Sequence, residues 1–352
     1  MMTRLHSDKL RLARWLRTTT QAELSASSGV SQAKISKIEN GLESGDDDIA
    51  DAIESALNLA PGFLRATGTR SSLPEHFYRK RASILVREQR WIEAVVVLAR
   101  QGIAALCESV SIEPSFPTPR IPCNLNTINP ASDVARDVRR LLMIPEGPIR
   151  SLVDVIESTG TIIIPIYGAP STFDAMASPA VTGSPWDLIF FNPEMPGDRI
   201  RFTLAHEFGH LIMHRGQSEN CEEEADDFAS EFLLPAANLR PLLRGLDLDR
   251  ALQLKQIWGS SIGALVYKAN ALGCISSNRY RSLQVMISQR GWRKDEPGHV
   301  PAPQPGLFHE IINIHLNNLN YSIGDIGHLF GVSGREFQDQ YFPQSLGLRI
   351  VK

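Results

Sequence analysis

The amino-acid sequence predicts a mainly α-helical protein with a small β-sheet, an α+β fold. Most of the 352 residues lie in segments whose apolar residues recur at helical spacing. Only two apolar runs have the length of a strand, GTIIIPIY at 160–167 and WDLIFFN at 186–192. Stretches rich in Gly and Pro separate these segments. We therefore expect an N-terminal all-α bundle, a mixed central domain and a small helical unit at the C-terminus.

The composition excludes several classes of protein. Hydrophobic residues make up 43% and charged residues 21% of the chain, as in ordinary globular proteins. No apolar run approaches the roughly 18 residues of a membrane span, and no apolar segment follows the basic N-terminal residues as in a signal peptide. The four cysteines have no paired spacing, which favours a reducing compartment over a disulfide framework. We expect a cytoplasmic protein that does not contact a membrane.

Breaks in the helical pattern divide the chain into four parts. Prolines are concentrated in two stretches. Five prolines lie between 111 and 131, and the second stretch is the Pro-rich DEPGHVPAPQPG at 295–306. Before the first stretch, 77–109 has the pattern of one long helix. The expected parts are the helical bundle (1–68), a helical linker (69–129), the mixed domain (130–294) and the C-terminal helical unit (307–352).

Charge is distributed unevenly over the N-terminal bundle. Residues 4–37 hold seven Lys and Arg against two acidic residues, whereas residues 39–54 hold seven acidic residues and no Lys or Arg. A small domain with a basic front and an acidic back would be oriented by the field of a polyanion. The net charge of the whole chain, −3, gives no such indication.

The stretch TQAELSASSGVSQAKISKIENG at 20–41 has the pattern of two short helices joined by a tight turn. Gly29 permits the turn, and Ser31 is the expected N-cap of the second helix. Ala26 would be the small residue where the helices cross, and Ile35 and Ile38 would fill the core. This leaves the polar and basic residues of the second helix on its outer face.

This stretch resembles the helix-turn-helix of the Cro/XRE family. The resemblance implies binding to operator DNA with the second helix in the major groove. A bundle that binds protein is the alternative, and a homodimer is expected because one copy makes few phosphate contacts. The residues expected to contact DNA are Gln21 at a phosphate, and Ser31, Gln32, Lys34, Ser36 and Lys37 on the second helix.

The C-terminal stretch YSIGDIGHLFGVSGREFQDQYF at 321–342 also has a helix-turn-helix pattern, with Gly331, Val332 and Ser333 at its turn. Arg335 is its one basic residue, so we do not expect it to contact DNA. A packing or dimerisation unit is the preferred interpretation.

The stretch TLAHEFGHLIMHR at 203–215 predicts a metal site. His206 and His210 are one helical turn apart, so both imidazoles can bind one ion. Glu207 follows the first histidine and could take the proton of a metal-activated water. Apolar residues flank the motif on both sides, and burying two histidines and a glutamate is costly without a partner such as a metal. His214, one turn later, could extend the site or be a structural histidine.

A third protein ligand is expected from the following stretch, CEEEADDFASEFLLP at 221–235. Two histidines and a glutamate complete a zinc site of the catalytic type. Glu222 and Glu224 flank the apolar stripe of this helix, and periodicity does not choose between them. Glu223 lies opposite the stripe, and we expect Glu223 and Asp226 to be solvated residues of the first turn.

Together, RIRFTLAHEFGHLIMH and EEEADDFASEFLLP resemble the ImmA/IrrE metallopeptidase family over about 130–290. Phe208 and Leu234 depart mildly from the family pattern. The resemblance implies a zincin-like, HExxH (gluzincin-like) fold, a Zn²⁺ held by His206, His210 and Glu224, and Glu207 as the base. It also implies cleavage of a repressor protein, in stress responses or mobile elements.

The sequence therefore predicts a DNA-binding regulator joined to a zinc-dependent endopeptidase. The run at 186–192 would be an edge strand that pairs with an extended protein substrate. One alternative is a transcription factor whose zinc domain senses a metal or ligand without proteolysis. A second alternative is an antitoxin-like protein that binds a partner and its own operator.

Overall fold

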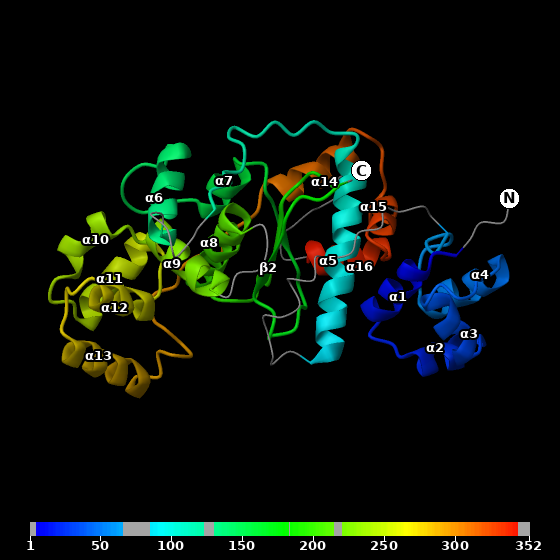
Figure 1. Ribbon diagram of the computed structural model, residues 1–352, viewed down its shortest axis with the longest axis horizontal. Helices are drawn as coiled ribbons and strands as arrows, with labels where there is room; N and C mark the ends of the chain where they lie inside the picture. The colour runs from blue at the N-terminus through cyan, green and yellow to red at the C-terminus, as the bar shows by residue number, and fades with distance from the viewer. Residues whose placement is uncertain (1–4, 66–84, 123–129, 183, 215–219, 344–352) are drawn as a thin grey trace.

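The computed structural model describes residues 5–65, 85–122, 130–182, 184–214 and 220–343, and it has the expected class, mainly helical with one small sheet. The molecule is elongated (Figure 1). A bundle of the first four helices lies at one end of its long axis, helices α10–α13 lie at the other, and the sheet lies between them. The expectations for residues 1–4, 66–84, 123–129 and 344–352 lie outside the described residues.

The N-terminal bundle forms where the local signals predict it. Thr20 and Glu23 make a capping box at the start of the second helix, and Gly29 ends that helix with a φ of 73°. The side chain of Ser31 accepts a hydrogen bond from the Lys34 amide, so Ser31 is the N-cap that was expected. The four helices are α1 (Ser7–Leu16), α2 (Gln21–Ser28), α3 (Gln32–Glu39) and α4 (Asp47–Ala56).

The sheet has three short strands in the order β1-β3-β2. Strand β3 (Leu188–Phe191) pairs in parallel with β1 (Ile162–Pro165) and antiparallel with β2 (Ala175–Ser178). The prediction that 186–192 is an edge strand is therefore wrong, because both edges of β3 are already hydrogen-bonded. In the described ranges the edge strand that packs against helix α8 (Gly197–Met213) is β2, which the sequence did not predict.

The two faces of the sheet belong to two different cores. Alternation along a strand sends successive side chains to opposite faces. In β1, Ile162 and Ile164 pack into the core that contains the N-terminal bundle, whereas Ile163 packs into the core that contains the metal-site helices. In β3, Phe190 and Phe191 divide in the same way. The sheet thus separates the two hydrophobic cores, with one face packed into each.

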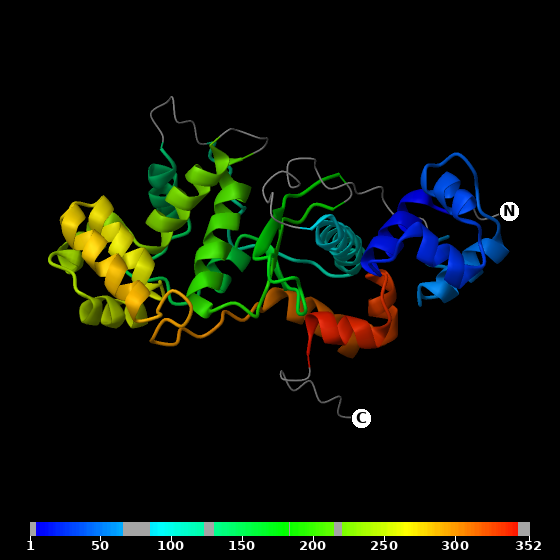
Figure 2. The ribbon, with the colours of Figure 1, turned by 90° about the horizontal axis from the view of Figure 1, so that it is seen from below.

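The first core extends from the N-terminal bundle to the C-terminus through helix α5 (Val86–Cys107). This helix packs against α1 on one side and α14 and α15 on another (Figure 2). Gly102 touches the ring of Phe330 so closely that an added Cβ would lie 2.5 Å from it. The C-terminal helices are α14 (Leu307–Asn317), α15 (Ile323–Leu329) and α16 (Gly334–Tyr341).

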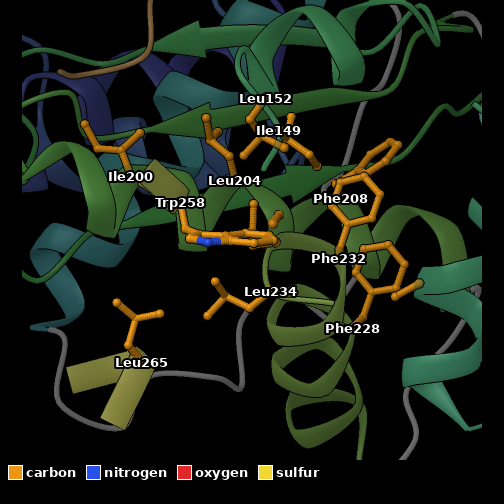
Figure 3. Close-up of a cluster of buried hydrophobic side chains, with 14 of the residues drawn as sticks. Ile149, Leu152, Ile200, Leu204, Phe208, Phe228, Phe232, Leu234, Trp258 and Leu265 are labelled. Carbon is orange, nitrogen blue, oxygen red and sulfur yellow. The ribbon is translucent and has the colours of Figure 1, made fainter. Parts of the chain in front are cut away.

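The second core lies beneath the metal-site helices. Figure 3 shows the rings of Phe208, Phe228 and Phe232 grouped at one end of this core and Ile200 at the other, with Leu204 between them. The spacing of four between Ile200, Leu204 and Phe208 places them on one helical face. Its helices are α6 (Ala131–Leu141), α7 (Leu152–Glu157), α8 (Gly197–Met213), α9 (Cys221–Leu233), α10 (Ala236–Leu243), α11 (Leu248–Trp258), α12 (Ile262–Ala271) and α13 (Ser277–Gln289).

Candidate metal centre and nucleic-acid interface

The candidate metal centre lies where helices α8 and α9 pack against each other. The close approach depends on Gly209, because a Cβ at that position would lie 2.8 Å from the ring of Phe228. Helix α8 also packs against strands β2 and β3. The helix pair therefore holds its polar face next to β2, at the edge of the sheet, while its apolar face fills the second core.

Three side chains converge at this place, His206 and His210 from α8 and Glu222 from α9. The Nε2 atoms of the two histidines are 3.0 Å apart, and Glu222 Oε1 lies 3.2 Å from the Nε2 atom of His210. Glu222 Oε2 lies 3.7 Å from the Nε2 atom of His206. In a tetrahedral zinc site with bonds of about 2.1 Å, neighbouring ligand atoms are about 3.4 Å apart. The three side chains therefore fit a zinc ion in both donor type and spacing.

Each histidine is oriented by a hydrogen bond at its other ring nitrogen. The Nδ1 atom of His206 lies 2.7 Å from Oδ1 of Asp226. The Nδ1 atom of His210 lies 2.8 Å from Nδ1 of His214, and Nε2 of His214 lies 2.8 Å from Oε2 of Glu224. A proton on Nδ1 of each ligand histidine satisfies these contacts and leaves both Nε2 lone pairs directed at the cluster.

The acidic residues of α9 thus divide differently from the sequence expectation. Glu222, half of whose side chain is exposed, lies beside the two histidines, whereas Glu224 is buried and contacts His214. Of the two alternatives that periodicity left open, the geometry favours Glu222 as the third ligand. Asp226 is exposed, as expected, and it also contacts the His206 ring.

Glu207 lies on the side of α8 that faces the sheet. Its Oε2 atom accepts a hydrogen bond of 2.7 Å from the backbone N–H of Ala177, on the edge strand β2. The bond fixes the plane of the carboxylate, and among the described residues nothing is hydrogen-bonded to the other oxygen, Oε1. A carboxylate next to a candidate metal cluster, with one oxygen fixed and one open, is suited to accept a proton.

The candidate DNA interface is the outer face of α3. Gln32 and Lys37 are exposed there, and Lys34 and Ser36 are partly exposed. Ser31 uses its side chain as the cap of α3. The Gln21 side chain points toward the inside of the bundle, where its Nε2 donates a 2.7 Å hydrogen bond to Glu39.

Three ion pairs shape this interface. A buried pair between Arg14 and Glu39, with bonds of 2.6 and 2.8 Å, holds α1 against α3. On the surface, Glu43 lies 3.6 Å from the Nζ atom of Lys34 and 3.7 Å from that of Lys37. Ala26, expected at the helix crossing, is exposed, and the buried residue of α2 is Leu24.

None of the helices in the described ranges is long and apolar enough to span a bilayer. No curated protein sequence matches the chain. Two family models match it. Residues 172–270, which contain β2, β3, α8 and α9, match the IrrE N-terminal-like domain (peptidase M78), and residues 10–64 match the helix-turn-helix family. The resemblance to an ImmA/IrrE metallopeptidase with an N-terminal Cro/XRE-type helix-turn-helix is confirmed over these two stretches.

Proposed function

We propose that the protein is a DNA-binding regulator that also acts as a zinc-dependent endopeptidase of the HExxH type, with a repressor or another regulatory protein as substrate. The observation that carries this proposal is the cluster of His206, His210 and Glu222 beside Glu207. Chance matches to a five-residue motif do not bring a carboxylate from a second helix to both histidines.

In this proposal His206, His210 and Glu222 hold the metal, and Asp226 and His214 orient the two imidazoles. The sequence resemblance favoured Glu224 as the third ligand. We assign Glu224 to the support of His214 instead, because its Oε2 lies 2.8 Å from that ring. Mutation of a group that orients a metal ligand typically lowers metal affinity by about 10- to 100-fold.

A bound zinc ion would supply a Lewis acid that makes water nucleophilic at neutral pH and polarises a peptide carbonyl. The chain's own part is to position the reactants and to move protons. Glu207 would take the proton of the attacking water at Oε1 and return it to the leaving amine. Strand β2, the edge strand next to α8, would align an extended substrate by those backbone groups that Glu207 does not bind.

The N-terminal domain would bind operator DNA through Gln32, Lys34, Ser36 and Lys37 on α3, with the N-terminus of this helix capped by Ser31. The Gln21 side chain, expected at a phosphate, is hydrogen-bonded to Glu39 instead. Tethering a peptidase to an operator would raise its effective concentration near a DNA-bound repressor. This supplies a physical reason for one chain to carry both domains.

The first experiment measures zinc per folded chain by mass spectrometry. Wild type is expected to bind one zinc, and Glu222→Ala to lose it. Glu223→Ala is the matched control, because Glu223 is an equally charged residue of the same helix turn that contacts neither histidine in the structure's described part. Loss of zinc in Glu224→Ala but not in Glu222→Ala would make Glu224 the ligand. A folded wild type that takes up no zinc would remove the peptidase proposal.

The second experiment measures cleavage of fluorescein-labelled casein and regulation of the protein's own promoter. Glu207→Gln is expected to keep zinc and lose about 100-fold or more in cleavage rate. If wild type binds zinc without cleaving any protein, and Glu207→Gln still regulates the promoter, the zinc domain is a sensor.

A further inference from the structure

Arg100 is a buried arginine of helix α5, with 1% of its surface exposed. It lies outside both stretches that match known families. Its Nε and Nη2 atoms donate to the hydroxyl of Ser178 at 3.1 and 2.7 Å, and Nη2 also donates to the Ser178 carbonyl. Its Nη1 atom donates to the hydroxyl of Ser184 at 2.9 Å and to the carbonyl of Trp186 at 3.2 Å. One side chain therefore binds both ends of the connection between β2 and β3.

The burial of Arg100 is costly for the fold. All hydrogen-bond acceptors that the described residues offer it are hydroxyl and carbonyl oxygens, and the carboxylate of Asp187 attracts it without accepting a hydrogen bond from it. Burial lowers the pKa of Arg100 to about 10, so the side chain is still a cation at neutral pH. An apolar side chain of similar volume would fill the space without this desolvation penalty. The contribution of the guanidinium is the fixed geometry of its donors.

The geometry fixed by Arg100 is next to the candidate base. Ser178 ends the edge strand β2, and the preceding residue, Ala177, donates its N–H to Oε2 of Glu207. The contacts run without a gap from α5 through Arg100 and Ser178 to Ala177 and then to Glu207. A shift of β2 relative to α8 would break the last of these contacts.

We propose that Arg100 is a positioning residue that fixes strand β2 and, through Ala177, the carboxylate of Glu207. The proposal rests on the proposed peptidase function and adds to it a residue from outside the peptidase domain. Helix α5 also packs against α1, where the guanidinium of Arg90 lies 5.6 Å from the ring centre of Trp15. The same helix thus connects the DNA-binding bundle to the strand beside the candidate active site.

The test compares Arg100→Met and Arg100→Lys with a matched control, Arg139→Met. Arg139 is also a buried arginine that binds backbone carbonyls, those of Phe232, Pro145 and Gly147, but it does not touch β2. For each full-length variant, zinc content, amide hydrogen exchange over 173–180, and kcat and KM for labelled casein are measured.

Arg100→Met is expected to keep its zinc, to exchange the β2 amides at least about tenfold faster, and to lose about 100-fold in kcat with little change in KM. Arg100→Lys keeps the charge and part of the contact with Ser178, so it should recover part of kcat. Arg139→Met should keep wild-type exchange over 173–180.

Wild-type exchange and kcat in Arg100→Met would overturn the proposal, as would equal effects in Arg139→Met. If wild type cleaves no casein, the kinetic measurement counts against the proposed peptidase function. The exchange arm then still decides whether Arg100 fixes β2, and unchanged exchange there rejects the positioning role.

Discussion

The helix-turn-helix near the N-terminus and the helix pair at the C-terminus are built on the same local pattern. Helices α2 and α15 each begin with a capping box, at Thr20 and Ser322. Nine residues after each cap stands a glycine with a φ of 73°, Gly29 in the first unit and Gly331 in the second. In both units the next helix begins at a serine N-cap two residues later, Ser31 or Ser333.

The two units differ in what their second helices present. Helix α3 presents Gln32, Lys34 and Lys37, which are polar or basic and at least partly exposed. Helix α16 presents Glu336, which forms an ion pair of 2.9 Å with Arg17 from the first unit. Gly331 also packs against Phe63 of that unit. Local capping and turn signals therefore specify a helix-turn-helix geometry, and the surface charge decides whether it is suited to DNA or to another domain.

The largest effect is expected at Gly327, where α15 crosses α16. A Cβ at Gly327 would lie 2.8 Å from the backbone carbon of Ser333 and 2.9 Å from the nitrogen of Gly334. Backbone cannot move aside as a flexible side chain can, so Gly327→Ala should lower the free energy of unfolding by about 3 kcal/mol. Urea denaturation measures this change.

The matched control is Ser25→Ala, at the corresponding position of α2. Ser25 already carries a Cβ and is half-buried, so this change should stay within about 0.5 kcal/mol of wild type. Equal changes in the two variants would show that the two helix crossings are not built differently.

The next largest effect concerns DNA affinity. Replacing Lys34 and Lys37 together by Ala removes two cations from the outer face of α3. Binding to a random-sequence 30-base-pair duplex at low salt should weaken about 30-fold, and the slope of log K against log salt should fall by about 2. Fluorescence anisotropy over a salt series measures both quantities.

Arg335→Ala is the corresponding change in α16, and it should alter neither quantity. The Arg335 side chain is 91% exposed, so its removal carries little risk for the fold. A loss of affinity in Arg335→Ala as large as that of the double variant would mean that both units contact DNA.

The sequence predicted the elements whose signals are local. Caps, turn glycines and apolar periodicity located α2, α3, α8 and α9, and the spacing of His206 and His210 indicated the candidate metal site. Ala26, expected at the helix crossing, is exposed, whereas its equally small neighbour Ser25 is half-buried. A period of 3.6 residues does not resolve neighbouring positions on a short helix.

The parts that could not be predicted depend on tertiary contacts. Strand β2 has the sequence AMAS, with no β-branched residue and no alternation of polar and apolar residues, so it lacks a strand signal. The contact between Asp226 and His206 joins two helices, and the burial of Arg100 requires α5 to lie against the sheet. Neither follows from the spacing of residues along the chain.

A smaller effect is expected where the C-terminal unit is attached to α7. Glu157 accepts hydrogen bonds of 3.1 Å from the amides of Gly306 and Leu307 at the start of α14. Burial raises the pKa of Glu157 to about 7, although these two bonds oppose the shift. A carboxyl whose pKa is raised on folding stabilises the fold most below its unfolded pKa, near 4.5, and this stabilisation is lost as pH rises through 7.

Glu157→Gln cannot ionise, so its stability should exceed that of wild type at pH 8, by on the order of 1–2 kcal/mol. The difference should shrink as pH falls and be smallest below about pH 4.5, where Glu157 is protonated in both states. Thermal unfolding between pH 4 and pH 8 measures it. A difference that is the same at both ends of this range would mean that Glu157 does not titrate there.

The smallest effect is expected at Glu43 in the N-terminal unit, where a substitution should raise the affinity for DNA. Glu43 lies near both Lys34 and Lys37. DNA must compete with this carboxylate for the two ammonium groups, so Glu43 is expected to weaken DNA binding. Because surface ion pairs contribute less than about 1 kcal/mol, Glu43→Gln should tighten binding to the same duplex only about threefold. Asp48→Asn is the control, since it removes the same charge from an exposed position of the same domain away from these lysines. A threefold gain in both variants would trace the effect to the net charge of the domain, whereas a gain in Glu43→Gln alone would show that the pairing with the lysines limits DNA affinity.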